Sequence, residues 1–274
     1  MIGFASPTTF LKAEKIPAVT AEEAYQLLNT ALDRFLALVA TLEPEDWDKP
    51  TLCTEWSVRD ILAHQAGGYA SGTGYKEMLR QGSRIPRRGQ LIEDAINEFQ
   101  LRERAHKSSA ELIAELHKVG PIAVQKWAYE FRLAKLLSIP HPIAGKLSFR
   151  YLMQVTHSRD TWMHRLDICR ATGHDFEQTR EHDGRIAELV VLDVANILAS
   201  KTDRPALVLE LTGIAGGTWK IGRGEPVATI TMDMLEFNIF ASGRYSYDEA
   251  RQLISITGDT PAAEETLKNI LVLY

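Results

Sequence analysis

The sequence predicts an α+β protein in which a helical bundle, about residues 1–202, precedes a small α+β domain, about residues 203–274. Long segments of the first part place apolar residues at helical spacing. Segments after residue 203 are instead rich in β-branched and aromatic residues and are bounded by Gly or Pro, which is typical of strands. A chain of 274 residues can bury a sizeable core without disulfides, and at ~150 residues per domain it forms one large or two ordinary domains.

Helix start signals recur through the first part of the chain. Thr20 with Glu23, and Ser57 with Asp60, have the spacing of a capping box. The segment after Thr20 carries one apolar stripe, made of Ala24, Leu27, Leu28, Leu32, Phe35, Leu36 and Val39. Further helices are expected from about Leu91, from Ala110 with a kink at Gly120-Pro121, over 148–172 before Gly173, and over 181–200, with loops at 81–89 and 138–146.

The second part alternates strand and helix signals. Strands are expected over 206–213, 217–222, 227–233 and 253–259. Short helices are expected over 234–244 and 261–274, the latter with Pro261 in its first turn.

Composition narrows the classes of protein that this chain can belong to. Lys and Arg total 31 and Asp and Glu total 36, so the net charge of −5 argues against a nucleic-acid partner. Two cysteines cannot form a disulfide framework, and the N-terminus lacks the features of a signal peptide. The best apolar run, 189–199, is interrupted by Asp193 and Asn196 and is shorter than the ~20 residues of a membrane span. We therefore expect a cytoplasmic monomer or homodimer without a membrane partner.

The segment RDTWMHRLDI contains the strongest candidate for a metal site. Asp160 and His164 stand four residues apart, so both project from one face of the predicted helix. A carboxylate and an imidazole one turn apart can chelate a divalent ion, by the reasoning that applies to His pairs on zinc-binding helices. A surface salt bridge is the alternative interpretation of the same spacing.

The predicted second helix repeats this spacing with Asp60 and His64. Asp60 lies where a capping box puts its carboxylate, which favours a capping role. His64 lies deeper, on the stripe that includes Trp56 and Ile61, and is either a metal ligand or a hydrogen-bonded core histidine. With Asp160 and His164 it would complete a set of two histidines and one carboxylate in the bundle core, and three protein ligands leave positions open for substrate, as in catalytic sites.

Two further side chains of the predicted 148–172 helix could take part in the site. His157 lies seven residues before His164 and could be a ligand, a polar group beside the metal, or a partly solvated histidine. Asp167 could orient the His164 imidazole, or form a salt bridge with Arg165 or Arg170.

Four segments together resemble the mycothiol-dependent maleylpyruvate isomerase family, part of the DinB-like group of metal-binding four-helix bundles. They are TLCTEWSVRDILAHQAGG, RDTWMHRLDICRATG, GGTWKIG and IFASGR. The resemblance implies an N-terminal bundle that binds a divalent metal through a histidine of the second helix and a Glu/His pair, followed by a small α+β domain. It carries His64, Asp160 and His164 over as metal ligands, with Asp160 where the characterised isomerases have Glu. Asp is one methylene shorter, so it must approach the metal more closely or bind through water.

The same resemblance implies the cofactors and the reaction. Zinc is the expected metal, with nickel, manganese or iron as alternatives, and mycothiol or a related thiol is the expected cofactor. A metal-bound thiol loses its proton and becomes an effective nucleophile toward a small electrophile, so an isomerase or S-transferase is implied. Neither Cys53 nor Cys169 is needed for this chemistry, and both are expected to be small buried side chains.

The resemblance also gives Arg244 a role with an anionic substrate. A guanidinium binds a carboxylate bidentately and keeps its charge, so we expect Arg244 to reach a cleft between the domains and bind an acidic group of substrate or thiol. A surface arginine after a glycine turn is the alternative. Trp219 matches a family strand position and is expected to pack in the core or between domains.

Two other functions remain open at this point. One is a non-catalytic bundle that binds a metal or small molecule, which the Asp-for-Glu difference keeps open. The other is an iron oxygenase with two histidines and one carboxylate, against which the helical context argues.

Overall fold

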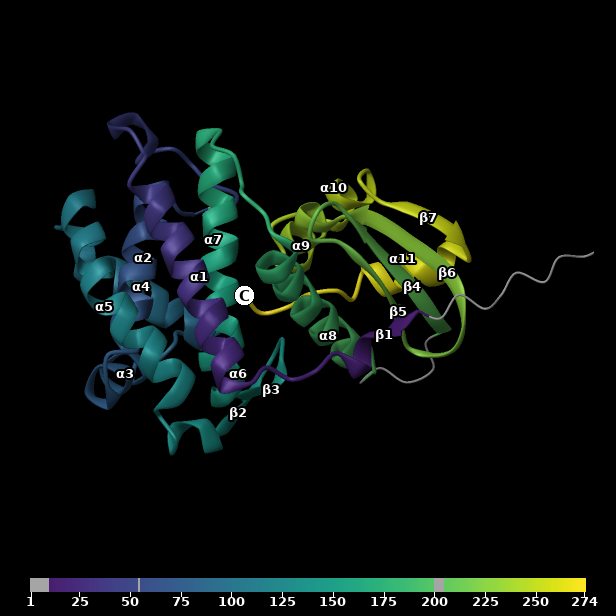
Figure 1. The fold of residues 1–274 in the computed structure, drawn as a ribbon, viewed down its shortest axis with the longest axis horizontal. Helices are drawn as coiled ribbons and strands as arrows, with labels where there is room; N and C mark the ends of the chain where they lie inside the picture. Colours follow the sequence, from purple (N-terminus) through teal and green to yellow (C-terminus); the bar gives the residue numbers. More distant parts are fainter. Residues whose placement is uncertain (1–9, 54, 200–204) are drawn as a thin grey trace, which may run out of the picture. The chain divides into compact units, whose positions relative to one another are not determined.

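The computed structural model describes residues 10–53, 55–199 and 205–274, and the chain divides into two compact units. The helical unit contains residues 19–140, 146–176 and 274. The sheet unit contains residues 141–145, 177–273 and the segment that ends at Ala18. The α+β class predicted from the sequence is confirmed, with helices in the first part and a sheet in the second (Figure 1).

Four helices of the helical unit form a bundle. They are α1 (Ala21–Val39), α2 (Val58–Ser71), α5 (Ser109–Tyr129) and α7 (His157–Thr172). Helices α1 and α2 each pack against both α5 and α7 (Figure 1). Two further helices, α3 (Tyr75–Gly82) and α4 (Ile92–Arg104), pack on α2. Short 3₁₀ turns lie at Pro44–Asp46 and Ala134–Leu136.

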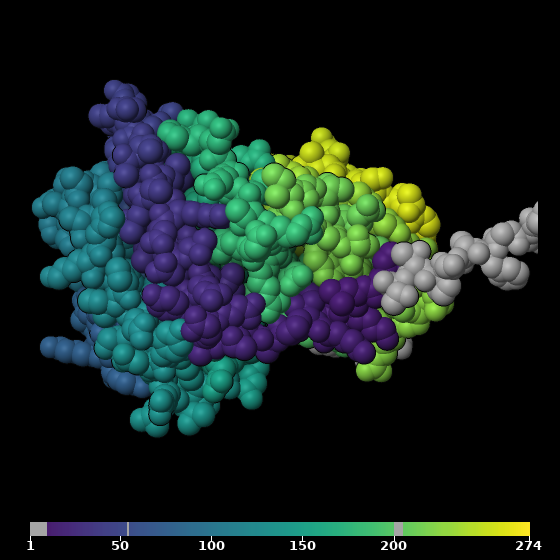
Figure 2. Space-filling model, viewed as in Figure 1, coloured from purple at the N-terminus to yellow at the C-terminus, as the bar shows by residue number. Residues whose placement is uncertain are grey.

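The predicted helix starts are confirmed by their caps. The Thr20 hydroxyl accepts a hydrogen bond from the Glu23 amide at 3.1 Å. Ser57 and Asp60 form a reciprocal capping box at the start of α2. The apolar stripe of α1 is buried in the bundle core, whereas its polar face lies on the surface that Figure 2 shows in purple. Burial of that stripe is what holds α1 in the bundle, because most of the stability of a helix in a protein comes from packing its apolar face.

The predicted helix over 148–172 is continuous but not uniform. It begins as α6 (Phe149–Tyr151), passes through a π-helical segment (Leu152–Thr156) and becomes α7. Gly173 ends α7 with a left-handed φ of 79°, as its sequence position predicted. π-helical segments inside α-helices are frequent at functional sites, and this one directly precedes α7.

Two segments of this part of the chain differ from the local predictions. Helix α3 was not predicted. Gly74 serves as its N-cap residue, and its end at Gly82 overlaps the loop that was expected over 81–89. The expected connector over 138–146 contains a two-stranded hairpin, β2 (Ser138–His141) and β3 (Gly145–Ser148). A two-stranded sheet consists of edge strands, where proline is tolerated. Helix α5 runs through Pro121, and the kink expected at Gly120-Pro121 stays a prediction.

The sheet unit contains a five-stranded sheet with the order β1-β5-β4-β6-β7. The strands are β1 (Leu11–Lys12), β4 (Pro205–Thr212), β5 (Gly217–Ile221), β6 (Arg223–Asp233) and β7 (Ser255–Gly258). The central strand β4 is parallel to β6 and antiparallel to β5. The four predicted strands are confirmed, and β1, which pairs in parallel with β5, was not predicted because it has only two residues.

Helices complete the sheet unit. They are α8 (Arg185–Ala199), α9 (Met234–Ala241), α10 (Tyr247–Arg251) and α11 (Thr260–Leu267), with short turns at Ala13–Lys15 and Arg180–Gly184. Helix α11 ends at Leu267, earlier than the predicted 274. Within the described ranges, the structure contains no helix with both the length and the apolar character that a bilayer span requires.

The predicted boundary at residues 202 and 203 lies outside the described residues. Helix α8, which we had expected in the bundle, packs against α9 and the Ala13–Lys15 turn and groups with the sheet unit. The affiliation of a helix depends on what its apolar face is buried against, which sequence position alone does not show. The limits of the two domains as independent folding units stay a prediction.

Candidate metal centre

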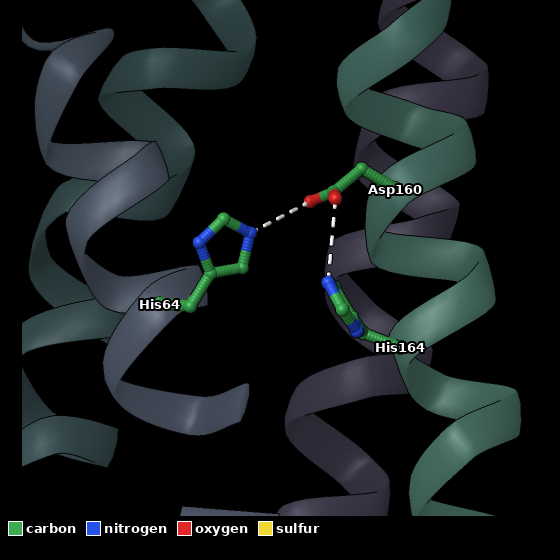
Figure 3. A group of neighbouring side chains, drawn as sticks. All are labelled: His64, Asp160 and His164. Atoms are coloured by element: carbon green, nitrogen blue, oxygen red, sulfur yellow. Dashed lines mark hydrogen bonds and ion pairs between the residues drawn. The ribbon is translucent and has the colours of Figure 1, made fainter. Parts of the chain in front are cut away.

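The structure brings His64, Asp160 and His164 together in the helical unit. His64 projects from α2, and Asp160 and His164 project from successive turns of α7 (Figure 3). One ligand atom from each of the three lies within 4.8 Å of the others. Both histidines are buried, so this group of three (the triad) lies inside the bundle rather than on its surface.

The carboxylate of Asp160 lies between the two imidazoles of the triad. Its Oδ2 is 3.4 Å from His64 Nε2, and its Oδ1 is 3.4 Å from His164 Nε2 (Figure 3). The shorter aspartate side chain therefore reaches both rings. The two Nε2 atoms face the same carboxylate, so the three donors converge on one region.

The opposite nitrogen of each imidazole has its own partner. His164 Nδ1 is 2.9 Å from Asp167 Oδ2, and His64 Nδ1 is 2.8 Å from Gln100 Oε1. Because both partner atoms are acceptors, each Nδ1 carries a proton, and in the neutral form of either ring the lone pair is then on Nε2. This is the tautomer that a metal ligand needs.

Asp160 is also held from the α2 side by polar side chains. Gln65 Nε2 donates to Asp160 Oδ2 at 2.6 Å, and Thr161 Oγ1 donates to Gln65 Oε1 at 2.8 Å. The Tyr69 hydroxyl lies 3.0 Å from Thr161 Oγ1, and burial raises the pKa of Tyr69, so it stays a neutral donor. These bonds orient the carboxylate, and they leave its charge in place.

The charges of the triad are strongly coupled. Burial opposes protonation of His164, but the charge of Asp160 and hydrogen bonds to Asp160 and Asp167 outweigh it and raise the His164 pKa to about 9. Burial would raise the pKa of Asp160, yet the two imidazoles hold it well below its usual range. Without a metal, the triad therefore holds a carboxylate beside an imidazolium at neutral pH.

An indole ring packs against both histidines. The ring centroid of Trp56 lies 4.8 Å from that of His64 and 5.5 Å from that of His164. The two imidazole centroids are 5.1 Å apart in an edge-to-face arrangement. Trp56 thus restrains the ring planes of both candidate ligands, which limits the rotamers that they can adopt.

The donor chemistry of the triad fits a divalent metal ion. Two neutral imidazoles and one ionised carboxylate are the ligand types that zinc and other first-row metals accept. The oriented Nδ1 atoms add the outer hydrogen bonds that such ligands almost always have. These observations, together with the burial of the triad, fit a metal better than a plain salt bridge on a helix surface.

Comparison with known proteins agrees with this arrangement. Residues 28–169 match the model of the mycothiol maleylpyruvate isomerase N-terminal domain, a range that covers more than half of the chain and includes the whole triad. The chain belongs to the mycothiol maleylpyruvate isomerase family. The family assignment suggested by the sequence motifs is thereby confirmed.

Solved structures extend the likeness over both units. The crystal structure of the mycothiol-dependent maleylpyruvate isomerase is similar with a TM-score of 0.57 and 14% identity. A histidine-to-alanine mutant of that enzyme gives a TM-score of 0.57 and 12% identity. Each match covers 92% of this chain and 98% of the other. At this identity the likeness concerns the fold. A comparison with curated proteins finds no match to the sequence.

The other polar residues singled out in this member of the family have different positions. Asp60 caps α2, as its capping interpretation predicted, and is not part of the triad. His157 stacks on Trp127 with ring centroids 3.9 Å apart, and burial lowers its pKa to about 4. It is therefore a neutral ring near the triad rather than a member of it. Asp167 contacts the His164 imidazole, as its orienting interpretation expected, and its role stays a prediction.

Arg244 and the cysteines lie outside the triad. Arg244 belongs to the sheet unit, where it follows Gly243, whose φ is 79°, and its amide donates to the Ile239 carbonyl at 3.1 Å. The turn expected at Gly243 is present, and the role of Arg244 with substrate stays a prediction. Burial raises the pKa of the Cys169 thiol to about 11, which fits an unreactive buried side chain. Cys53 is only partly buried.

Three glutamines of the site were missed by sequence reasoning. Gln65 contacts Asp160, Gln100 contacts His64, and Gln81 contacts Gln100. Amides carry no charge and show no characteristic spacing, so nothing in the sequence separates them from surface glutamines. The one available signal is that Gln65 directly follows His64.

Proposed function

We propose that this protein is a divalent-metal-dependent enzyme that uses a low-molecular-weight thiol of the mycothiol type to isomerise or conjugate a small electrophile. The observation that carries the proposal is the triad, whose three donor atoms converge within 4.8 Å while both Nδ1 atoms have acceptors. Family membership supports the thiol, because the matched domain is described by its use of mycothiol.

His64, Asp160 and His164 would hold the metal, with zinc as the first candidate and nickel, manganese or iron as alternatives. A metal bound there would acidify a coordinated thiol, so that the reactive thiolate is present at neutral pH. The triad supplies a single negative charge. One positive charge of a divalent cation is then uncompensated, which favours an anionic fourth ligand such as a thiolate.

The remaining residues of the site position these groups. Asp167 and Gln100 orient the two imidazoles, and Gln65 orients the carboxylate. Trp56 packs against both imidazole rings and restrains their orientation. None of these side chains is a nucleophile, so the attacking group in this proposal comes from the thiol.

Arg244 is proposed to bind an acidic group of the substrate or of the thiol. Losing one charge-assisted contact costs about 10–100-fold in affinity. Arg244→Ala should show this loss, and Arg244→Lys should recover only part of it because an ammonium lacks the planar fork. Ligand titration of the three proteins tests the role. Equal affinities and turnover in all three would remove Arg244 from the site.

The experiment that tests the whole proposal has two steps. Protein purified without chelator is analysed for metal, and the metal-loaded protein is assayed with mycothiol and related thiols against maleylpyruvate and other small anionic electrophiles. The proposal expects stoichiometric divalent metal and turnover that requires both metal and thiol. Stoichiometric metal without any thiol-dependent turnover would favour a non-catalytic binding protein instead. Oxygen-dependent turnover with Fe(II) would favour an oxygenase.

A further inference from the structure

A chain of two buried amides connects His64 to the backbone of its own helix. His64 Nδ1 contacts Gln100 Oε1 at 2.8 Å, and Gln100 Nε2 donates to Gln81 Oε1 at 2.8 Å. Gln81 Nε2 then donates to the Gly67 carbonyl at 3.0 Å. We call Gln81 and Gln100 the amide relay. Their exposed fractions are 2% and 3%, so water does not compete for these bonds.

The Gly67 carbonyl, at the end of the amide relay away from His64, determines which atom donates and which accepts in each hydrogen bond of the relay. A backbone carbonyl can only accept, so the amide nitrogen of Gln81 must face Gly67. The same nitrogen donates to Glu77 Oε1 at 2.9 Å, and a hydrogen bond from Arg80 lowers the pKa of Glu77, so that carboxylate also only accepts. The Gln81 oxygen is left for Gln100.

The orientation of the Gln81 amide determines the orientation of the Gln100 amide, and so which atom faces His64. Because Gln81 presents an oxygen, Gln100 turns its nitrogen toward Gln81 and its oxygen toward His64. An oxygen beside Nδ1 requires a proton on Nδ1, which leaves the lone pair on Nε2. Asp160 Oδ2, 3.4 Å from Nε2, would by itself favour the opposite tautomer in the metal-free protein.

Where α4 packs on α2, Gln100 of the relay lies directly against Gly67. A Cβ atom at Gly67 would lie 2.7 Å from both Cβ and Cγ of Gln100, which is closer than side chains can approach. The missing side chain at Gly67 therefore lets Gln100 lie against α2. At the next position, Gly68, a Cβ atom would meet nothing within 4 Å.

We propose that Gln81 and Gln100 are positioning residues that set the Nδ1–H tautomer of His64, so that its Nε2 lone pair is presented to the metal. The importance of that lone pair rests on the proposed function, whereas the tautomer is a property of the metal-free protein. Asp167 gives Nδ1 of His164 a charged acceptor, whereas the amide relay gives Nδ1 of His64 an acceptor without adding charge to the site.

The test is NMR of metal-free protein with ¹⁵N-labelled histidine at alkaline pH, where two-bond ¹H–¹⁵N correlations identify which ring nitrogen carries the proton. Wild-type His64 is expected as the Nδ1–H tautomer. Gln100→Met removes the acceptor and should move His64 toward Nε2–H, and Gln81→Met should produce a smaller shift in the same direction. Gln100→Glu keeps an acceptor beside Nδ1 and should retain the wild-type tautomer.

Gln154→Met is the matched control, because Gln154 is also buried in the helical unit but donates to the Ala128 carbonyl. It should leave the His64 tautomer unchanged. An Nε2–H tautomer in the wild type, or no change in Gln100→Met, would overturn the proposal. A change of the same size in Gln100→Glu, or in the Gln154→Met control, would overturn it as well, because the loss of an acceptor could not then be the cause. No change in Gln81→Met alone would remove Gln81 from it.

A zinc titration separates this proposal from the proposed function. Gln100→Met should weaken zinc binding ~10-fold, the lower end of what the loss of an outer-shell partner costs. Wild-type protein that shows the Nδ1–H tautomer but binds no zinc would refute the metal site and leave the amide relay standing. Unaltered zinc affinity in a Gln100→Met protein with the shifted tautomer would refute the link between tautomer and metal.

Discussion

The α7 side and the α2 side of the triad support an imidazole by different means. On α7, His164 is oriented by Asp167, which lies on the same helix three residues away. On α2, His64 is oriented by Gln100, which comes from α4, and indirectly by Gln81 of α3. The first support is local and charged, and the second is long-range and neutral. The charged support is part of what raises the pKa of His164 to about 9.

The two imidazoles are thus oriented in the same way, one by a residue of its own helix and the other by residues of other helices. The geometry of Asp160, His164 and Asp167 follows from helical spacing and survives as long as α7 is a helix. The geometry around His64 requires α2, α3 and α4 to pack correctly. We therefore expect the α2 side to be more sensitive to packing and the α7 side to be more sensitive to charge.

Removing either imidazole should have the largest effect. His64→Ala and His164→Ala should each weaken zinc binding by more than the ~10–100-fold that loss of an outer-shell partner costs, because a donor atom itself is lost. Competition with a chromophoric chelator measures the affinity, and circular dichroism checks that the variants remain folded. His117→Ala is the control, since His117 is exposed on α5. Stoichiometric zinc in both site variants would refute the triad.

Changes at Asp160 should separate charge from size on the α7 side. Asp160→Asn keeps the size of the side chain but removes its charge. It should weaken zinc binding at least ~10-fold, because the zinc ion loses its one anionic ligand in the triad. Asp160→Glu keeps the charge, introduces the residue type that the family resemblance implies at this position, and should preserve binding. Equal affinity in the wild type and both variants would mean that the carboxylate does not touch the metal.

The free energy of unfolding of the metal-free protein should depend on pH, because the carboxylates of Asp160 and Asp167 stabilise protonated His164. Its folded pKa of about 9 lies above the ordinary value of 6.5, so protonated His164 stabilises the folded state. That stabilisation is complete below about pH 6.5, is lost as the pH rises through about 9, and is on the order of 3 kcal/mol. Chemical unfolding of metal-free protein at several pH values measures it.

Asp167→Asn sharpens this measurement, because Asn can still accept from Nδ1 without the charge. The loss of stability should then be smaller and should be complete at a lower pH. Zinc binding must displace the proton of His164, so zinc affinity should rise over the same pH range in the wild type. A stability of the metal-free wild type that does not change between pH 6.5 and 9 would contradict the assigned coupling.

Two neighbouring glycines of α2 should have opposite effects on stability. Gly67→Ala forces Gln100 away from α2 and should destabilise the fold by about 1–3 kcal/mol, as overpacking does. Gly68→Ala meets no obstacle and should stabilise the helix by about 0.5–1 kcal/mol. Urea unfolding of both variants measures the difference. Similar stability of the two variants would show that the α2–α4 contact is not tightly packed.

Spacing along single helices made several features predictable from the sequence. The spacing of four positions from Asp160 to His164 places both on one face of any helix, and Ser57 with Asp60 places a carboxylate at the start of α2. The orienting role of Asp167 has the same local origin. Four motif segments, two of them around His64 and His164, indicated the family, and segments rich in β-branched and aromatic residues predicted the strands of the sheet.

Contacts between segments far apart in the chain required the tertiary structure. Whether His64 or His157 would join Asp160 depends on how α2 packs on α7, because both histidines lie at suitable positions along their helices. The partners Gln100 and Gln81 are supplied by α4 and α3, and α3 was not predicted at all. The affiliation of α8 with the sheet unit was likewise decided by packing. Helical periodicity sets which residues share a face, but only the packing of helices decides what that face meets.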